Sequence, residues 1–396
     1  MPSSAQVPRA TVIGAGLAGV RFIRRLAELD PGTADRTVLV GDEPHAPYNR
    51  VLLTDVLAGR YAPHVITLPR PHGTHLRTRA IRIDRAARTV HCADGTSLPY
   101  RTLVLATGAH PVRPPLRGHT FRTMDDCLAL SAAVRPGTRV LVVGGGPLGV
   151  SAARALAARG ARVVLAERED RLMKSHLDAT AAEFVRQHLH RTGVDVRTSW
   201  CPPQPRTAPP GTDLTVLACG ARPRTGLARA AGLTVRSGIV VDDELRTSDP
   251  HIRAIGDCAE HAGRVYGHAA PALEQADALA ASLTAPPHSE PARYHGTRAL
   301  TRLTLDGTGP ADPFDLAAFG SGDTLPGDDV VQLTDATRRT YRKVVVRGER
   351  LVGGVLVGAL GSVGALARAW ADGEPLTAAG TGGGPPLHLL TPDGGR

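Results

Sequence analysis

The chain has 396 residues, enough for about two to four domains. Hydrophobic residues make up 42% and charged residues 21%, which is ordinary for a folded protein and excludes wholesale disorder, a collagen-like fibre and a small disulfide scaffold. The net charge is +10, but the 47 basic residues are scattered, nearly all are arginine, and aromatic residues make up 3%. Binding to nucleic acid needs a concentrated basic patch, so we expect none and assign the positive field to an acidic redox partner.

The cysteines give no sign of a metal site or a disulfide. There are five, none of them in a Cys-x-x-Cys pair: Cys92, Cys127, Cys201, Cys219 and Cys258. An odd number at irregular spacing predicts reduced thiols, no bound metal and a reducing compartment. The segment before Ala10 lacks a signal-peptide pattern, and the uncharged run Leu351–Ala367 is rich in glycine, which indicates a strand followed by a helix. We expect a cytoplasmic protein without a membrane span.

Strand and helix signals alternate in the first half of the chain. Two units share the order strand, helix, strand: Ala10–Ile13, Val20–Leu29 and Thr37–Val40, then Arg139–Val143, Pro147–Arg159 and Arg162–Ala166. This alternation predicts parallel sheets covered by helices, and its recurrence indicates a duplicated architecture. Nearer the C-terminus, Tyr341–Val346 and Leu351–Val357 flank a short polar turn and predict a β-hairpin.

Each unit joins its first strand to its helix through a glycine-rich turn. The two turns are Gly14-Ala15-Gly16-Leu17-Ala18-Gly19 and Gly144-Gly145-Gly146-Pro147-Leu148-Gly149. In each, the first glycine permits the tight turn, the third residue lets the backbone approach a pyrophosphate, and the sixth lets the helix pack on the strand. The helix starts, at Leu17-Ala18 and Pro147-Leu148, direct a positive dipole end at the phosphates. The pattern predicts a dinucleotide site at each turn.

Acidic residues follow the second strand of each unit, where ribose hydroxyls are bound in such sites. Asp42 and Glu43 stand there in the first unit and Glu167 in the second. A carboxylate at this place disfavours a 2′-phosphate, although Arg168 beside Glu167 softens the preference. Two sites imply two cofactors. We expect FAD in the first and NADH in the second, with NADPH as the alternative, so that hydride passes between them.

Three further runs resemble the FAD/pyridine-nucleotide oxidoreductase family. They are Leu103–Gly108, which ends Ala-Thr-Gly, Leu214–Gly220, which ends Ala-Cys-Gly, and Thr247–Cys258, which contains Gly256-Asp257. The resemblance implies that Thr107 and Gly108 return the chain past FAD and that Gly220 is their counterpart beside NAD. It also implies that Gly256-Asp257 binds the ribityl chain of the flavin.

Within this family, the chain looks most like the FAD- and NAD(H)-binding front part of assimilatory nitrite reductase large subunits. The electron-transfer subunits of assimilatory nitrate reductases are similar as well. The matching runs are Glu43-Pro44-His45, Tyr48–Val51, Phe121–Asp126, Asp170–Met173, Val265-Tyr266-Gly267, Ala270-Pro271 and Glu274-Gln275-Ala276. The likeness implies that Arg50 lies near the flavin or its phosphates. It implies too that the segment from Pro271 through Glu274 to Gln275 starts a helix whose N-terminus faces the flavin's pyrimidine edge.

Some departures from the family narrow the mechanism. Flavoenzymes of the family that act on disulfides or peroxides carry a cysteine just after the Arg50 region, and Val51–Asp55 has none. This argues against dithiol chemistry. Ferredoxin reductases of the putidaredoxin type have a Lys near Asp55 and a Glu near Ser151, and both are absent here. Where family members insert a three-stranded meander, we find only Cys201–Gly211.

The pattern and the resemblance together predict an α/β fold with two Rossmann-like dinucleotide-binding domains and a small α+β C-terminal domain. We expect residues 1–125 and 240–283 to form the FAD domain and 126–239 the NAD domain. Residues 284–372 would form the family's interface domain, which could pair two chains as a homodimer. Residues 373–396 are expected to be a flexible tail.

The expected function is an NAD(P)H-dependent FAD oxidoreductase that passes electrons to an external partner in nitrate or nitrite assimilation. No side-chain acid or base is required, because the cofactors carry the chemistry. The expected partner is an acidic iron–sulfur or molybdenum-containing reductase. Two alternatives stay open: a rubredoxin or ferredoxin reductase serving a mono-oxygenase, and a catalytically silent nucleotide-binding scaffold subunit.

Overall fold

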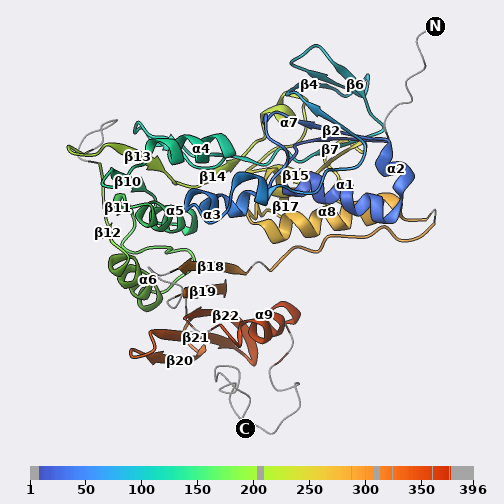
Figure 1. The fold of residues 1–396 in the computed structure, drawn as a ribbon. Coiled ribbons are helices and arrows are strands. Elements are labelled where there is room, and N and C mark those ends of the chain that lie inside the picture. The colour runs from blue at the N-terminus through green and yellow to red at the C-terminus, as the bar shows by residue number, and fades with distance from the viewer. Residues whose placement is uncertain are drawn as a thin grey trace.

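The structure is a computed structural model that describes residues 9–202, 209–286, 288–298, 300–306, 313–322, 324–358, 360–373 and 375. The expected tail at 373–396 lies, apart from residues 373 and 375, outside the described residues. Figure 1 shows two α/β units side by side and a third, strand-rich unit drawn in red below them. The predicted fold class is confirmed: two parallel sheets are followed by an antiparallel sheet with one helix packed on it.

The first unit is a five-stranded parallel sheet that carries the first glycine turn. Its strands, in spatial order, are β16 (Ile252–Ala254), β7 (Thr102–Leu105), β1 (Ala10–Ile13), β2 (Thr37–Gly41) and β3 (Thr74–Arg77). Helices α1 (Leu17–Leu29) and α8 (Ala269–Thr284) pack against each other (Figure 1), and Arg21 Nε lies 2.5 Å from Asp277 Oδ1. Helix α2 (Pro31–Asp35) follows, capped by the Asp30 side chain.

The second unit repeats this plan around the second glycine turn. Its parallel strands are β12 (Val194–Arg197), β11 (Arg162–Ala166), β10 (Arg139–Val143), β13 (Leu214–Leu217) and β9 (His119–Thr120). Its helices are α4 (Met124–Ala133), α5 (Pro147–Ala158) and α6 (Ala179–Arg191). Between β12 and β13, the described residues 198–202 and 209–213 form no strand. The duplicated architecture predicted from the sequence is therefore present.

Smaller elements connect and flank the two units. The antiparallel pair β8 (Ala109–Pro111) and β14 (Ala221–Pro223) joins the segment after β7 to the segment after β13. The remaining strands are β4 (Ala80–Asp84), β5 (Thr89–Cys92), β6 (Ser97–Pro99), β15 (Ile239–Val241) and β17 (Ala259–His261). Short helices are α3 (Leu53–Leu57), α7 (Gly226–Ala230) and the 3-10 turns Arg50–Leu52, Pro63–Ile66 and Gly256–Cys258.

The C-terminal unit is an antiparallel sheet with one helix. Its strands, in spatial order, are β18 (Thr301–Asp306), β19 (Pro313–Gly320), β22 (Arg350–Val357), β21 (Thr340–Arg347) and β20 (Asp329–Asp335). Strands β21 and β22 are the predicted hairpin. The uncharged run Leu351–Ala367 forms β22 and enters α9 (Val363–Asp372), as expected.

Two large apolar cores hold these units together. One lies within the first unit and includes side chains of α1 and α8. The other runs from the second sheet into the C-terminal sheet, because Phe314, Leu316 and Tyr341 belong to it. Asp178 strengthens this junction: its carboxylate caps α6, accepts the Tyr341 hydroxyl at 2.7 Å and lies 3.2 Å from Lys343 Nζ. No helix in the described part of the chain is both long and apolar enough to cross a lipid bilayer.

Candidate functional site

A cleft opens at the carboxyl ends of β1, β2 and β7, around the first glycine turn. Open α/β sheets bind their ligands at this edge. Twelve of the residues predicted from the sequence line it: Gly14, Gly16, Leu17, Ala18, Asp42, Glu43, Arg50, Thr107, Gly108, Leu148, Gly256 and Asp257. Residues from five separate parts of the chain therefore meet here, as the dinucleotide-site hypothesis requires.

The first glycine turn has the shape that a pyrophosphate needs. Gly14 has a φ of +119°, and a Cβ there would collide with the Ala106 carbonyl. A Cβ on Gly19 would collide in turn with the Gly14 carbonyl, whereas one on Gly16 would meet nothing within 4 Å. Helix α1 starts at this open space with neither a capping side chain nor an acid in its first turn. Its free N–H groups and positive dipole end fit a dinucleotide phosphate.

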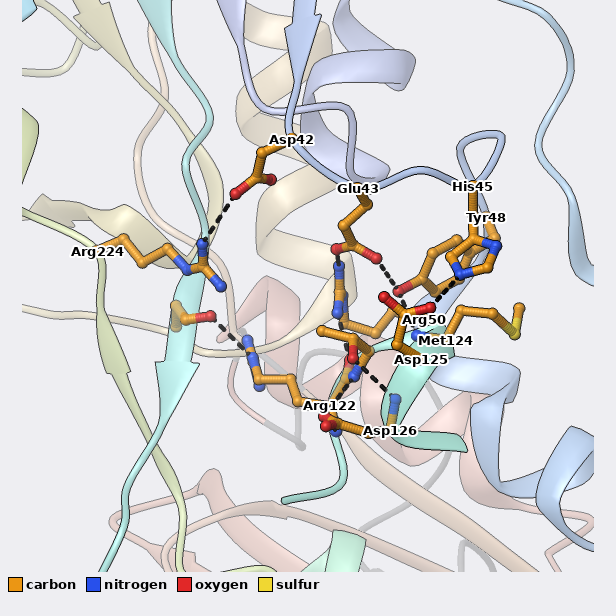
Figure 2. Close-up of polar contacts among 12 residues, drawn as sticks. Asp42, Glu43, His45, Tyr48, Arg50, Arg122, Met124, Asp125, Asp126 and Arg224 are labelled. Carbon is orange, nitrogen blue, oxygen red and sulfur yellow. Dashed lines mark hydrogen bonds and ion pairs between the residues drawn. The ribbon is translucent and has the colours of Figure 1, made fainter. Parts of the chain in front are cut away.

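The two acids after β2 have different surroundings (Figure 2). Glu43 accepts hydrogen bonds from the Tyr48 hydroxyl and from Arg50 Nη2, both at 2.6 Å. The Tyr48 oxygen also accepts the Met124 N–H at 2.9 Å, and burial raises the pKa of Tyr48. Asp42 has a looser contact, because its Oδ2 lies 3.8 Å from Arg224 Nη1. Asp42 is thus the carboxylate with more capacity left for a ribose.

Arg50 is tied into the wall of the cleft by more than Glu43. Its Nη1 donates to the Arg122 carbonyl (Figure 2), and its guanidinium lies over the Tyr48 ring. Arg122 itself donates to the Ala109 carbonyl at 3.0 Å and to Asp257 Oδ2 at 2.8 Å. Sequence reasoning gave Arg122 no role, although the run Phe121–Asp126 was part of the family resemblance. The residue gains its importance from Asp257, which is distant in sequence.

Helix α8 supplies the floor of the cleft near Gly256. The helix starts at Ala269, two residues before the predicted Pro271, and its N-cap His268 lines the cleft with Ala269 and Ala272. Pro271 is buried, and Gln275 Oε1 accepts the Gly256 N–H at 2.7 Å. Glu274 instead accepts the Thr297 hydroxyl at 2.5 Å. Gln275 thereby holds the Gly256-Asp257 turn in place.

The second glycine turn has the same backbone form. Gly144 has a φ of +110°, a Cβ on Gly149 would collide with the Gly144 carbonyl, and one on Gly146 would meet nothing within 4 Å. Helix α5 begins there without a capping side chain. Gly220, which follows β13, accepts the Val112 N–H at 2.9 Å and so fixes the chain returning past this turn. The turn fits a second dinucleotide.

The acid of the second unit folds back onto its own turn. Glu167 accepts the Gly145 N–H and, at 2.9 Å, the Glu169 N–H. The neighbouring Arg168 side chain is 83% exposed and pairs with Glu169 at 3.3 Å. Lys174 also pairs with Glu169, at 3.2 Å. Arg168 and Lys174 are therefore both paired with an acidic residue nearby.

The second turn reaches the cleft of the first through one residue, and Gly144, Gly146, Pro147 and Gly149 are not among the residues that line it. Leu148, in the first turn of α5, lines the cleft formed around the first glycine turn. No cysteine is among the cleft's lining residues, and the described residues contain no group of three or more potential metal ligands. The start of α5 thus borders the cleft of the first turn, and the lining of that cleft holds no thiol.

Comparison with known proteins identifies the family. The model of the pyridine nucleotide-disulphide oxidoreductase family matches residues 8–202 and 206–276. The chain belongs to this family. It is accordingly an FAD-dependent NAD(P)H oxidoreductase, and FAD and NAD(P)H are its cofactors.

Three similar proteins represent two kinds of reductase. The chain is 34% identical to a nitrite reductase [NAD(P)H] large subunit of Klebsiella oxytoca, over 93% of this chain and 40% of that protein. It is 32% identical to an assimilatory nitrate reductase electron transfer subunit of Bacillus subtilis, over 88% of this chain and 47% of that protein. A probable ferredoxin reductase of Castellaniella defragrans is 34% identical over 72% of this chain and 77% of that protein. The chain thus spans less than half the length of the two nitrogen-assimilation relatives.

A solved structure shares the whole fold. The putidaredoxin reductase in its covalent complex with putidaredoxin has a TM-score of 0.81 and covers 97% of this chain and 98% of that one, at 24% identity. At this identity the likeness establishes the fold alone.

Proposed function

We propose that this protein takes electrons from NAD(P)H through FAD and delivers them to a separate redox protein, in nitrate or nitrite assimilation. The observation that carries the proposal is the position of Leu148, which belongs to the second turn and lines the cleft of the first. Two cofactors bound at adjoining sites can exchange hydride without release. The relatedness to nitrite reductase and nitrate reductase subunits supports the assimilatory setting.

We assign FAD to the first turn and NADH, in preference to NADPH, to the second. When bound, FAD accepts hydride from a nicotinamide and releases electrons one at a time. The residues around FAD bind and orient the cofactor. The free N–H groups at the start of α1 receive phosphate, and Asp42 accepts ribose hydroxyls. The Arg122–Asp257 pair and the start of α8 hold the far wall of the cleft, with a positive dipole end directed at it.

A thiol has no part in the proposed reaction. Val51 and Leu53, which line the cleft after Arg50, belong to the run Val51–Asp55, in which the resemblance led us to look for a cysteine and which has none. Cys127 and Cys258 are buried, and burial raises the pKa of both thiols. A thiol with a raised pKa is a poor nucleophile at neutral pH. Electrons therefore leave for an outside acceptor rather than for a disulfide of this chain.

The acceptor we propose is an acidic iron–sulfur or molybdenum-containing protein. The net charge of +10 attracts an acidic partner, and such attraction weakens as salt screens it. The use of NAD(P)H and reduced cysteines favours the cytoplasm. The sequence boundaries given above for the FAD, NAD and C-terminal domains, and a homodimer formed through the C-terminal sheet, are parts of the same proposal.

The test is reduction of the purified protein and of its acceptors. We expect a yellow protein whose flavin absorbance bleaches with NADH, and NADH-driven reduction of an acidic iron–sulfur protein that slows several-fold between low and high salt. A colourless protein that stays colourless after incubation with FAD contradicts the proposal. Turnover that is indifferent to ionic strength removes the acidic-partner part alone.

A second candidate is a ferredoxin or rubredoxin reductase serving a mono-oxygenase. The favouring observation is similarity: the chain is 34% identical to the probable ferredoxin reductase of Castellaniella defragrans over 72% of this chain. Turnover with purified ferredoxin and rubredoxin, set beside turnover with nitrate and nitrite reductase partners, distinguishes the two. The function whose acceptor gives the higher kcat/KM is the one supported.

A further inference from the structure

We propose that Arg224 is a cofactor-binding residue whose guanidinium binds the pyrophosphate of the dinucleotide held at the first glycine turn. The inference rests on the proposed assignment of FAD to that turn. Arg224 belongs to neither glycine motif, and nothing in the sequence pattern around it points to a phosphate. Its placement is a product of the tertiary structure.

Arg224 reaches the cleft from the second unit's return segment. It directly follows β14, and its side chain lines the cleft around the first turn. Its backbone is fixed there, since its N–H donates to the Gly108 carbonyl at 2.9 Å and its carbonyl accepts the Thr107 hydroxyl at 2.8 Å. Gly108 and Thr107 line the same cleft. The main chain of Arg224 is thus anchored, while its side chain extends into the site.

Three arginines line the cleft, and Arg224 differs from the other two. Arg50 donates to a carboxylate and a carbonyl, and so does Arg122. Within the described part of the chain, the guanidinium of Arg224 contacts one side chain, Asp42, at 3.8 Å, which is too long for a hydrogen bond. The Arg224 side chain is 44% exposed. It retains the donors that a bidentate phosphate contact uses, whereas the other two serve as wall.

The charges around the cleft also favour Arg224 as the phosphate-binding arginine. Glu43 neutralises Arg50 and Asp257 neutralises Arg122 at hydrogen-bonding distance, which leaves Arg224 the least neutralised cation of the three. Burial lowers the pKa of Arg122, and the positive charges of Arg50 and Arg224 add to this effect against Asp257. A bound anion relieves that repulsion. Helix α1 presents its uncapped start to the same cleft, so a phosphate there meets both a dipole end and a guanidinium.

The contact with Asp42 decides which dinucleotide Arg224 serves. Asp42 follows β2 of the first unit, the strand beside β1 and its glycine turn (Figure 2 shows Arg224 facing it). The acid after this strand marks the ribose end of a dinucleotide, and the pyrophosphate lies next to that ribose. A role toward NAD(P)H instead would move the NADH affinity, and the experiment separates these outcomes.

The experiment titrates flavin-free protein with FAD and follows the quenching of flavin fluorescence. The variants are Arg224→Ala and Arg224→Lys, and the matched control is Arg222→Ala. Arg222 lies on β14 itself, is exposed and does not line the cleft. For Arg224→Ala we expect the Kd for FAD to rise about 10- to 100-fold and to depend less on salt concentration. Arg224→Lys should recover part of the affinity, because the charge stays but the fork is lost.

A further readout separates binding from structure. The thermal unfolding midpoint of the flavin-free protein should be the same for Arg224→Ala and the parent chain, since Arg224 makes no hydrogen bond to another described side chain. Equal FAD affinity of parent and Arg224→Ala overturns the inference, and so does a raised Kd for NADH with the FAD affinity unchanged. If Arg224→Ala does not fold, Arg224→Lys carries the comparison. A parent chain that binds no FAD overturns the proposed function itself.

Discussion

The two glycine turns have the same backbone and different surroundings. In both turns, a glycine with positive φ lies against the residue that follows a neighbouring strand of the sheet. A second glycine lets the helix approach the first. The registers Ile13 with Val40 and Val143 with Ala166 make Gly41 the counterpart of Glu167. At the end of its second strand, the first unit thus has glycine where the second unit has its acid.

This exchange has a steric reason. A Cβ on Gly41 would lie 2.7 Å from the Ala15 Cβ, whereas a Cβ on Gly145 would lie 2.9 Å from Glu167. Where the turn carries alanine, as at Ala15, the end of the second strand has room only for glycine. Where the turn carries glycine, the strand end can carry a carboxylate that bonds the turn. The first site therefore takes its acids from the following loop, which is fastened to α4 by Tyr48 and Met124. In the second site the acid and the turn thus bond each other within one unit, whereas the first site is assembled from both α/β units.

The largest expected effects come from two separate variants, each of which blocks one glycine turn with a larger side chain. Gly19→Val should abolish FAD retention, because the added carbons collide with the Gly14 carbonyl. Gly149→Val should leave the protein yellow but cut the NADH affinity at least about 10-fold, a loss of about 1.4 kcal/mol. Flavin content by absorbance and NADH binding by titration check both.

The two variants control each other, because each blocks one cofactor and spares the other. If Gly149→Val lost flavin while Gly19→Val kept it, the assignment of cofactors to turns would be reversed. Circular dichroism of both variants verifies that the fold persists.

The second expected effect concerns nicotinamide choice. Glu167→Ala removes the carboxylate that accepts the Gly145 and Glu169 N–H groups. We expect kcat/KM for NADH to fall about 10-fold and that for NADPH to fall less, since the lost charge also repelled the 2′-phosphate. Glu183→Gln, on the exposed face of α6, is the control and should change neither value. Equal losses for both nucleotides would contradict the role of Glu167 in selection.

A third expected effect tests whether the first site is assembled across units. Tyr48→Phe leaves Glu43 with Arg50 as its remaining partner and leaves the Met124 N–H without a bond, in a region where Tyr48 is 6% exposed. The expected loss is about 1–3 kcal/mol in the free energy of unfolding, together with weaker FAD binding. Urea denaturation measures the first quantity. Tyr61→Phe, on a 42% exposed residue, should stay within about 0.5 kcal/mol of the parent chain, and an equal loss there would refute the explanation.

The smallest expected effect concerns the junction of the second unit with the C-terminal sheet. Asp178 is opposed by burial, but its hydrogen bonds to Ala181, Tyr341 and Lys343 outweigh burial and lower its pKa. A lowered pKa in the folded state stabilises the fold above the unfolded value, near 3.9, and this stability is lost as the pH falls below it. Asp178→Asn should therefore cost about 1–2 kcal/mol at neutral pH.

The pH dependence provides the check on that last prediction. Unfolding of Asp178→Asn and of the parent chain is compared from neutral pH down to about pH 3, and the difference should shrink below about pH 4. Asp195→Asn, an exposed residue of β12, serves as the control and should show no such difference. A gap that stays constant with pH would mean that the Asp178 charge is not responsible.

Several features of this protein were predictable from local sequence. The glycine turns, the strands that precede them and the helices that follow them depend on backbone sterics and short-range apolar spacing, which each segment carries within itself. The hairpin of β21 and β22 has the same local origin. The family resemblance supplied Gly256-Asp257 and the start of α8, since those runs are short and their order is specific.

What only the tertiary structure decided was which side chains share the cleft and which already have partners. Glu43 and Asp42 are adjacent and alike in sequence, yet one is held by Tyr48 and Arg50 and the other faces Arg224. Arg122 and Arg224 reach the site from β9 and β14, far along the chain from the first glycine turn. Hydrogen bonds and ion pairs depend on distance in space, and distance in space between remote segments is fixed by how the two sheets pack, which no local pattern encodes.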